Sequence, residues 1–182
     1  FFGQIVLQYA STGWFDLKWG WLRGHSFFDK GEYYRLLTAN FLHAHIPHLL
    51  MNMYGLHILG QYAEYMMGKK NFIIVYLICA IGSTFLCALV DVFMQESGLV
   101  LGASGAILGI AGALAGISIY RKVNNIYRGV QLDYQQLLMA LGLNVALGLV
   151  PGISFMGHLG GALTGLAVGF VYAFLIEKKI IK

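Results

Sequence analysis

The chain has 182 residues, of which 58% are hydrophobic and only 11% are charged, and its mean hydropathy is +0.69. Soluble domains carry about 25% charged residues, so this composition argues against a water-soluble fold and predicts one all-α, polytopic membrane domain over residues 1–182. The formal net charge is +4, but the basic residues lie in short segments between apolar stretches. That pattern is typical of membrane orientation, so we expect no nucleic-acid partner.

The first residues predict an incomplete helix followed by a long loop. The chain begins on Phe1, and residues 1–10 are apolar but only about half of the ~20 residues that a membrane span needs. We interpret them as the end of a first helix whose beginning is absent. The loop over 11–47 is rich in aromatic residues, which favours a position in the membrane interface. These residues are Trp14, Phe15, Trp19, Trp21, Phe27, Phe28, Tyr33 and Tyr34.

Five further apolar segments predict helices over 48–67, 71–94, 104–120, 134–150 and 157–176. Cys79 and Cys87 lie in the second of these segments. On a helix their Cα atoms would be about 12 Å apart along the axis, too far for a disulfide, so we expect them to be packing residues. Asn144 lies in the fourth segment and is expected to cap a helix or to bond between helices.

The basic residues orient these helices. Eight of the twelve Lys and Arg residues would lie at one membrane face, which is then assigned to the cytoplasm. These eight residues are Lys69, Lys70, Arg121, Lys122, Arg128, Lys178, Lys179 and Lys182. With the partial first helix included, the prediction is six helices with both chain ends at the cytoplasmic face.

Polar residues then gather at one depth near the other face. The helices beginning near residues 48, 104 and 157 all run inward from the outer face. Their first turns carry His48 and Asn52, Ser104, and His158. Ionisable residues inside a membrane are energetically costly and therefore indicate function.

Glycines would allow the helices that carry Ser104 and His158 to approach closely. One helix has glycines at 105, 109, 112 and 116, and the other has them at 157, 161, 165 and 169. Serine needs a neighbouring base to become a nucleophile, and no carboxylate is expected nearby, so the pattern predicts a Ser104–His158 dyad. His48 and Asn52 are one helical turn apart and could stabilise an oxyanion.

Simpler interpretations stay open for single residues. Ser104 alone could be a small packing residue, and His158 alone could be a buried histidine bonded to a carbonyl; the combination favours catalysis. His43 and His45 are interpreted as interface polarity, with metal binding as a minor alternative. The sequence shows no spacing typical of a metal site, and we predict no metal and no cofactor.

Taken in order along the chain, five short motifs resemble those of the rhomboid intramembrane serine proteases of the bacterial type. They are Tyr34-Arg35, His48-Leu-Leu-Met-Asn52, the Gly60, Glu64 and Gly68 pattern, Gly102-Ala103-Ser104-Gly105, and Gly157-His158-Leu-Gly-Gly161. The resemblance implies a bundle of six transmembrane helices in which Arg35, Glu64, Gly161 and Gly165 are structural. Family members often have Trp where this chain has Tyr34. They often have an aromatic residue where this chain has Leu108, which would orient the catalytic histidine less firmly.

The resemblance also implies a function. Ser104 would attack, and His158 would act as general base and then acid. His48, Asn52 and the Ser104 N–H would stabilise the oxyanion. The substrates would be transmembrane segments of other proteins, cut near the outer face and admitted past the fifth helix and loop 151–156. Lipids would be the other partners, the oligomeric state is not predicted, and the location would be a bacterial cytoplasmic (inner) membrane.

Two other functions are weighed against the protease. One is a weakly active or inactive rhomboid-like protein that binds transmembrane clients, although such proteins usually lose the catalytic residues that this chain keeps. The other is a small channel or transporter. It is the weakest, because polar residues thin out beyond the outer half of the helices starting at 104 and 157.

Overall fold

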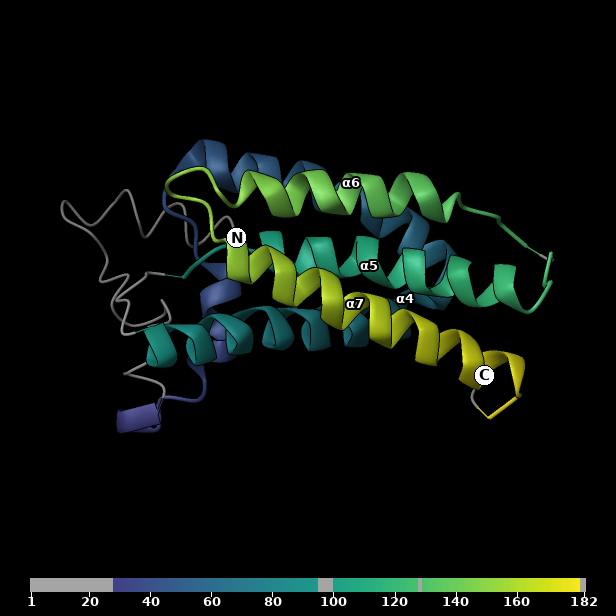
Figure 1. Cartoon of the computed structure of the whole chain (residues 1–182), viewed down its shortest axis with the longest axis horizontal. Coiled ribbons are helices and arrows are strands. Elements are labelled where there is room, and N and C mark those ends of the chain that lie inside the picture. The colour runs from purple at the N-terminus through teal and green to yellow at the C-terminus, as the bar shows by residue number, and fades with distance from the viewer. Residues whose placement is uncertain (1–27, 95–99, 128, 181–182) are drawn as a thin grey trace.

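The computed structural model describes residues 28–94, 100–127 and 129–180, and all of the regular elements in these ranges are helices. Along the chain they are α3 (Arg35–Thr38), the 3-10 helix η2 (Ala39–Phe41), α4 (Ile46–Met94), α5 (Ser104–Val123), α6 (Tyr134–Leu147) and α7 (Phe155–Glu177). Figure 1 shows the four long helices side by side. The all-α prediction is confirmed. The predicted first helix, over 1–10, and the aromatic loop as far as Phe27 lie outside the described residues.

One glycine divides α4 into two membrane helices. Gly68 has φ 76° and ψ 158°, a region that is essentially restricted to glycine. The chain turns back at this residue (Figure 1), so helical stretches over 46–67 and 69–94 replace the predicted helices over 48–67 and 71–94. The loop expected over 68–70 is therefore wrong. Lys69 and Lys70 already belong to the second stretch, because a single glycine makes the turn.

The last two helices differ from their predicted bounds for local reasons. α6 was expected to reach residue 150 but ends at Leu147, since the N–H groups of Gly148, Leu149 and Val150 bond to carbonyls three residues earlier. α7 was expected from 157 but begins at Phe155, because the Ser154 hydroxyl accepts the Gly157 N–H at 3.0 Å and caps the helix.

The predicted helix over 104–120 starts at Ser104 as expected and continues to Val123. By length and composition, three helices of the described part of the chain could cross a membrane: α4, α5 and α7. α6 has 14 residues and is about 21 Å long, short of the ~30 Å hydrocarbon core. The chain is an integral, multi-pass membrane protein.

The two ends of the bundle carry different kinds of polar residues. The starts of α4, α5 and α7 lie at one end of the bundle, and the Gly68 turn and the ends of α5 and α7 lie at the other (Figure 1). The second end carries Lys69, Lys70, Arg121, Lys122, Lys178 and Lys179, and we call it the basic end. The first end carries the polar residues of the candidate site.

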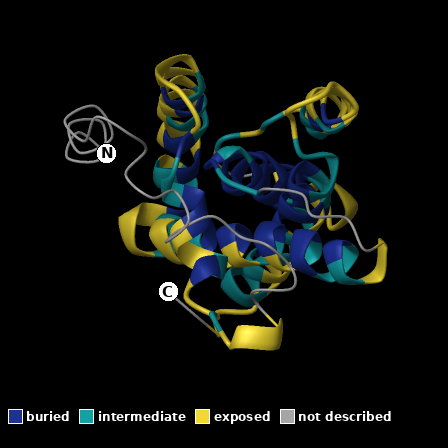
Figure 2. Ribbon diagram, turned by 90° about the vertical axis from the view of Figure 1, so that its left-hand side faces the viewer, coloured by how far each residue is buried: buried dark blue, intermediate teal, exposed yellow. Residues whose placement is uncertain are grey.

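α5 forms the core of the bundle. Every residue from Gly105 to Ser118 is buried, and Figure 2 shows the buried residues concentrated at the centre with exposed residues around them. α5 packs on α7 through backbone atoms: a Cβ placed on Gly161, Gly165 or Gly169 would overlap the carbonyl of Gly105, Gly109 or Ala113. The two glycine stripes thus lie directly against each other, with no side chain between them.

We predict that Gly165→Ala destabilises the protein by about 3 kcal/mol, because the new methyl group meets the Gly109 backbone, which cannot move aside. Thermal unfolding in detergent measures the change. Gly142→Ala on α6 is the matched control, since a Cβ there meets nothing within 4 Å and the change should be neutral or slightly stabilising. Equal unfolding temperatures for the two variants would show that the α5–α7 contact is not tight.

Candidate active site

Ser104 and His158 meet at the starts of two helices. Ser104 is the first residue of α5 and His158 lies in the first turn of α7. The distance from Ser104 Oγ to His158 Nε2 is 3.0 Å, a hydrogen bond. His158 is buried, with 8% of its surface exposed. The glycine contact between the helices places these two first turns side by side.

The second ring nitrogen of His158 fixes its tautomer. His158 Nδ1 lies 2.9 Å from the backbone carbonyl oxygen of Asn144, on α6. A carbonyl can only accept, so Nδ1 carries the proton in this bond. In the neutral ring Nε2 is then the acceptor, and the Ser104 hydroxyl donates to it. This is the proton arrangement in which a histidine can act as a base toward serine.

The early end of α6 frees the Asn144 carbonyl. In a continuing helix this oxygen would accept the N–H of residue 148. The Gly148 N–H instead bonds to Val145 O at 2.9 Å, which leaves the Asn144 oxygen for the imidazole. The sequence analysis missed this contact. Gly148 and Pro151 are helix-ending signals, but they do not reveal where the freed carbonyl points.

The turn before Ser104 brings in His48 and Asn52. Gly102 has φ 111°, and a Cβ on it would lie 2.7 Å from His48 Nε2 and 3.6 Å from Asn52 Nδ2. Only glycine therefore fits against these side chains. The Gly102 N–H bonds to Ala39 O at 3.0 Å, which ties the turn to η2. Asn52 Nδ2 is buried and has no hydrogen-bond partner among the described residues.

His43 and His45 both contact His48. His45 Nδ1 accepts the His48 backbone N–H at 3.1 Å, at the start of α4. The His43 ring packs edge-on against the His48 ring, with 5.1 Å between centroids. Burial, and after it the charge of His48, lowers the pKa of His43 to about 4, so His43 is neutral near pH 7. In the described ranges no group of three or more His, Cys, Asp or Glu residues could hold a metal ion.

Ser83, on α4, lies beneath the Ser104–His158 pair and was not singled out from the sequence. Its hydroxyl donates to the Gly157 carbonyl at 2.7 Å, and a Cβ on Gly105 would overlap the same hydroxyl oxygen. Ser83 thus contacts the residue after Ser104 and the residue before His158. Two adjacent hydroxyls, Ser83 and Thr84, within an apolar segment were the available signal.

The segment before α4, which contains α3 and η2, is hydrogen-bonded to the second half of α4. The Thr84 hydroxyl donates to Leu36 O at 2.6 Å, and Asn40 Nδ2 donates to Ala80 O at 3.3 Å. Because η2 in turn holds Gly102, these bonds connect the segment to the turn that carries Ser104.

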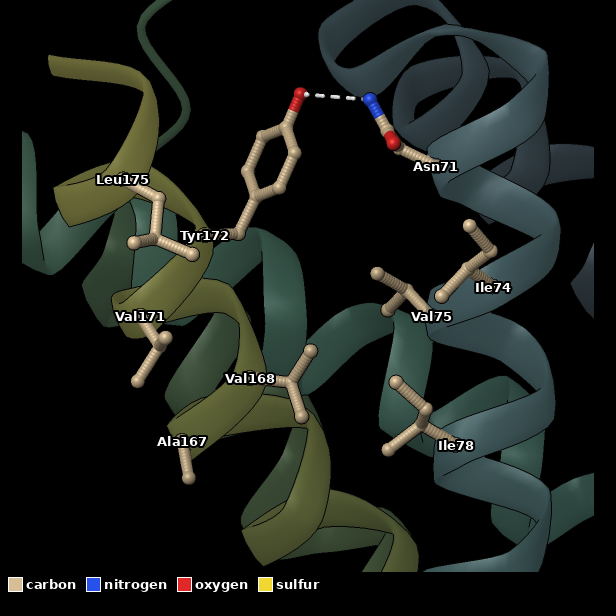
Figure 3. A pocket seen from close by; sticks show the side chains of 9 residues that line it. All are labelled: Asn71, Ile74, Val75, Ile78, Ala167, Val168, Val171, Tyr172 and Leu175. Carbon is tan, nitrogen blue, oxygen red and sulfur yellow. Dashed lines mark hydrogen bonds between the residues drawn. The ribbon is translucent and has the colours of Figure 1, made fainter. Parts of the chain in front are cut away.

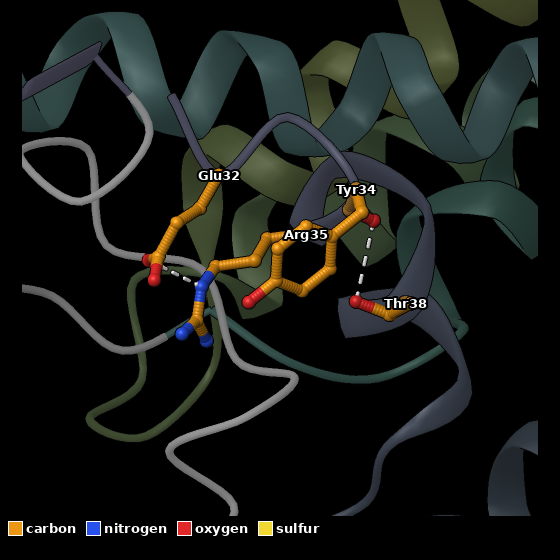
Figure 4. Close-up of polar contacts among 4 residues, drawn as sticks. All are labelled: Glu32, Tyr34, Arg35 and Thr38. Carbon is orange, nitrogen blue, oxygen red and sulfur yellow. Dashed lines mark hydrogen bonds and ion pairs between the residues drawn. The ribbon is translucent and has the colours of Figure 1, made fainter. Parts of the chain in front are cut away.

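Arg35 and Glu64 have separate partners. Arg35 is buried, its Nε donates to Glu32 Oε2 at 2.7 Å, and its guanidinium lies 5.4 Å from the centre of the Tyr34 ring (Figure 4). Thr38 Oγ1 bonds to Tyr34 O in the same turn. Glu64 lies near the basic end, 3.8 Å from Lys69 Nζ. The two motif residues therefore make their contacts in different parts of the chain.

Leu108 lies one turn below Ser104 and is buried in a small apolar cluster. The cluster also contains Ala111, Ala115, Leu141 and Ala162. Leu141 is the one buried residue of α6, so this cluster attaches the helix that carries the Asn144 carbonyl.

The chain is similar to known proteins along most of its length. The family model described as Rhomboid domain matches residues 30–174. Three relatives from Arabidopsis thaliana are RHOMBOID-like protein 6, mitochondrial (37% identical over 77% of this chain), RHOMBOID-like protein 2 (37% over 85%) and RHOMBOID-like protein 4 (36% over 77%). The matches cover 44%, 47% and 34% of these relatives, so the chain spans under half of their length.

We predict that nitrogen-15 NMR of histidine-labelled protein shows His158 as the Nδ1–H tautomer, because the Asn144 carbonyl accepts that proton. Ser104→Ala should leave the tautomer unchanged, since Nε2 only accepts from Ser104. A switch to Nε2–H in Ser104→Ala would mean that the serine, and not the α6 carbonyl, fixes the ring.

Proposed function

Because the chain belongs to the rhomboid family, we propose that it is an intramembrane serine endopeptidase that cleaves transmembrane segments of other membrane proteins. The single observation that carries the proposal is the hydrogen bond of 3.0 Å between Ser104 Oγ and His158 Nε2, with Nδ1 held by a carbonyl. Ser104 is the proposed nucleophile and His158 the proposed general base and acid.

The first half of the reaction forms an acyl-enzyme. Ser104 Oγ attacks the carbonyl carbon of the scissile peptide while its proton passes to His158 Nε2. The carbonyl oxygen becomes an oxyanion. His158 then gives the proton to the departing amide nitrogen, the C–N bond breaks, and the substrate's acyl group remains as an ester on Ser104.

The second half consumes one water molecule. His158 takes a proton from the water, whose oxygen attacks the ester carbon. The Ser104–acyl bond then breaks, and Ser104 Oγ recovers the proton from His158. The products are a new carboxylate end and a new amino end.

Three donors are proposed for the oxyanion. The Ser104 N–H belongs to the first turn of α5, where backbone donors have no intrahelical acceptor. The other two proposed donors are the side chains of Asn52 and His48, which both lie beside Gly102. Asn52 Nδ2 is buried and has no hydrogen-bond partner among the described residues. An unpaired buried donor is costly, and a developing negative charge would satisfy it.

We propose that substrates approach past α6 and loop 151–156. Among the residues of α6 only Leu141 is buried, so this helix is the least firmly packed side of the site. A peptide bond in a helix is protected, so segments with helix-weakening Gly or Pro should be preferred.

The proposed site lies at the end of the bundle opposite the basic end. By the positive-inside rule, it therefore faces away from the membrane side that holds the basic loops. The named relatives are plant proteins, one of them called mitochondrial, and they give no support to the bacterial inner membrane that the sequence analysis expected.

The dyad is tested with a purified transmembrane substrate. Ser104→Ala and His158→Ala should each lower cleavage by at least about 1,000-fold, and Ser104→Ala should abolish labelling by a fluorophosphonate. Ser118→Ala removes a buried serine hydroxyl near the other end of α5, where it bonds to Leu114 O, and should keep both. If the unaltered protein is not labelled and does not cleave while it still binds a transmembrane segment, the chain is a client-binding member of the family.

Asn52→Ala should lower kcat by about 100-fold and change KM little, because an oxyanion donor acts in the transition state. Asn124→Ala is the matched control at the opposite end of α5, where the amide bonds to Tyr120 O. A rise in KM with kcat unchanged would assign Asn52 to substrate binding instead.

A further inference from the structure

A groove lies between the second half of α4 and α7, near the basic end and away from the candidate active site. Its volume is about 390 Å³. Figure 3 shows its walls, which are aliphatic except for Asn71 and Tyr172 at one end. The residues that line it are Asn71, Ile74, Val75, Ile78, Ala167, Val168, Val171, Tyr172 and Leu175.

The groove forms because the two helices touch at one level and separate toward the basic end. They are in contact at Gly82, where an added Cβ would overlap the Thr164 side chain. Beyond the groove they are bridged again by side chains: Asn71 Nδ2 donates to Tyr172 Oη at 3.5 Å, and Tyr172 Oη donates to Met67 O at 3.3 Å. Between these levels an apolar, elongated space is left.

The groove opens to the outside of the bundle. Ile74, Ile78 and Val171 are 44%, 42% and 53% exposed, and they belong to helices long and apolar enough to cross a membrane. From Ala167 to Leu175 the groove is about 12 Å long, close to the ~15 Å of one leaflet's hydrocarbon. Its size and walls therefore suit part of one acyl chain.

The charged residues near the Asn71 and Tyr172 end of the groove indicate what kind of lipid headgroup would bind there. Lys70 precedes Asn71, and Lys178 and Lys179 follow Leu175 by about one turn. The three acids described at this end have their own partners: Glu64 lies beside Lys69, and Glu177 lies 3.9 Å from Arg121. The Asp133 carboxylate accepts the backbone N–H groups of Gln135 and Gln136 at the start of α6. Lys70, Lys178 and Lys179 have no acidic partner in the described residues, so the polar end attracts negative charge.

We propose that this groove binds an anionic glycerophospholipid, with an acyl chain against the Ile74 and Val171 walls and the phosphate headgroup near Lys70, Lys178 and Lys179. The lipid would fill the space where α4 and α7 separate and would stabilise their spacing at the basic end. The proposal does not depend on proteolysis.

The test uses the purified protein in phosphatidylcholine vesicles that contain a small amount of a photoreactive lipid. In one preparation this lipid is phosphatidylglycerol with a photoreactive acyl chain, and in the other it is phosphatidylcholine with the same chain. We expect phosphatidylglycerol to label the groove residues of both α4 and α7 more strongly than phosphatidylcholine does. Ile74→Trp, which fills the groove, should remove this labelling. Ile73→Trp is the matched control, since Ile73 is similarly exposed at 54% but does not line the groove.

The charge requirement is tested separately. Lys178→Gln and Lys179→Gln should each reduce the preference for phosphatidylglycerol by about fivefold, whereas Lys30→Gln, outside the basic end, should not. Labelling spread evenly over all lipid-facing helices, or equal for the two lipids, would overturn the proposal. So would cross-links from a photoreactive residue at position 171 to residues 1–27 or to a second copy, because the occupant would then be protein.

Discussion

The backbone contact between α5 and α7 is the constraint on which the rest of the structure depends. Gly161, Gly165 and Gly169 place their Cα atoms against carbonyls of α5, with no room for a side chain. In a membrane, helices gain little from excluding lipid, so close van der Waals packing is what holds them together. At this separation, the first residue of α5 and the first turn of α7 come within hydrogen-bond distance. Ser83 fixes the same separation from a third helix.

Both ring nitrogens of His158 have their hydrogen-bond partners inside the protein, as a lipid environment requires. Among the described residues no carboxylate bonds to the His158 ring, and Leu108 is not aromatic. A backbone carbonyl of α6 does the orienting instead. The imidazole thereby depends on a helix in which only Leu141 is buried. The position of α6 and the proton arrangement of the proposed dyad are therefore linked.

The two ends of the bundle differ in how their helices meet. At the site end α4, α5 and α7 are drawn together by glycines and by the Ser83 hydroxyl. At the basic end α4 and α7 separate, and long side chains such as Tyr172 span the gap. Tight packing holds Ser104 and His158 in place at the first end, while the separation leaves an apolar groove at the second.

The sequence by itself determined the all-α membrane class, the approximate positions of the described helices, and the family motifs. These follow from local properties: apolar segments of membrane length, glycines at helical spacing, and basic residues in short loops. The pairing of Ser104 with His158 could also be expected, because helix direction puts both at one depth.

Only the tertiary structure decided the rest. Periodicity does not record the local features that set the helix bounds. These are the backbone conformation of Gly68, the turn hydrogen bonds that end α6 at Leu147, and the Ser154 side-chain cap. The Asn144 carbonyl and the Ser83 hydroxyl act on residues far along the chain. A backbone oxygen has no sequence signature, and a serine has none that distinguishes packing from bonding. Their roles arise when three helices meet at one level, which no single segment specifies.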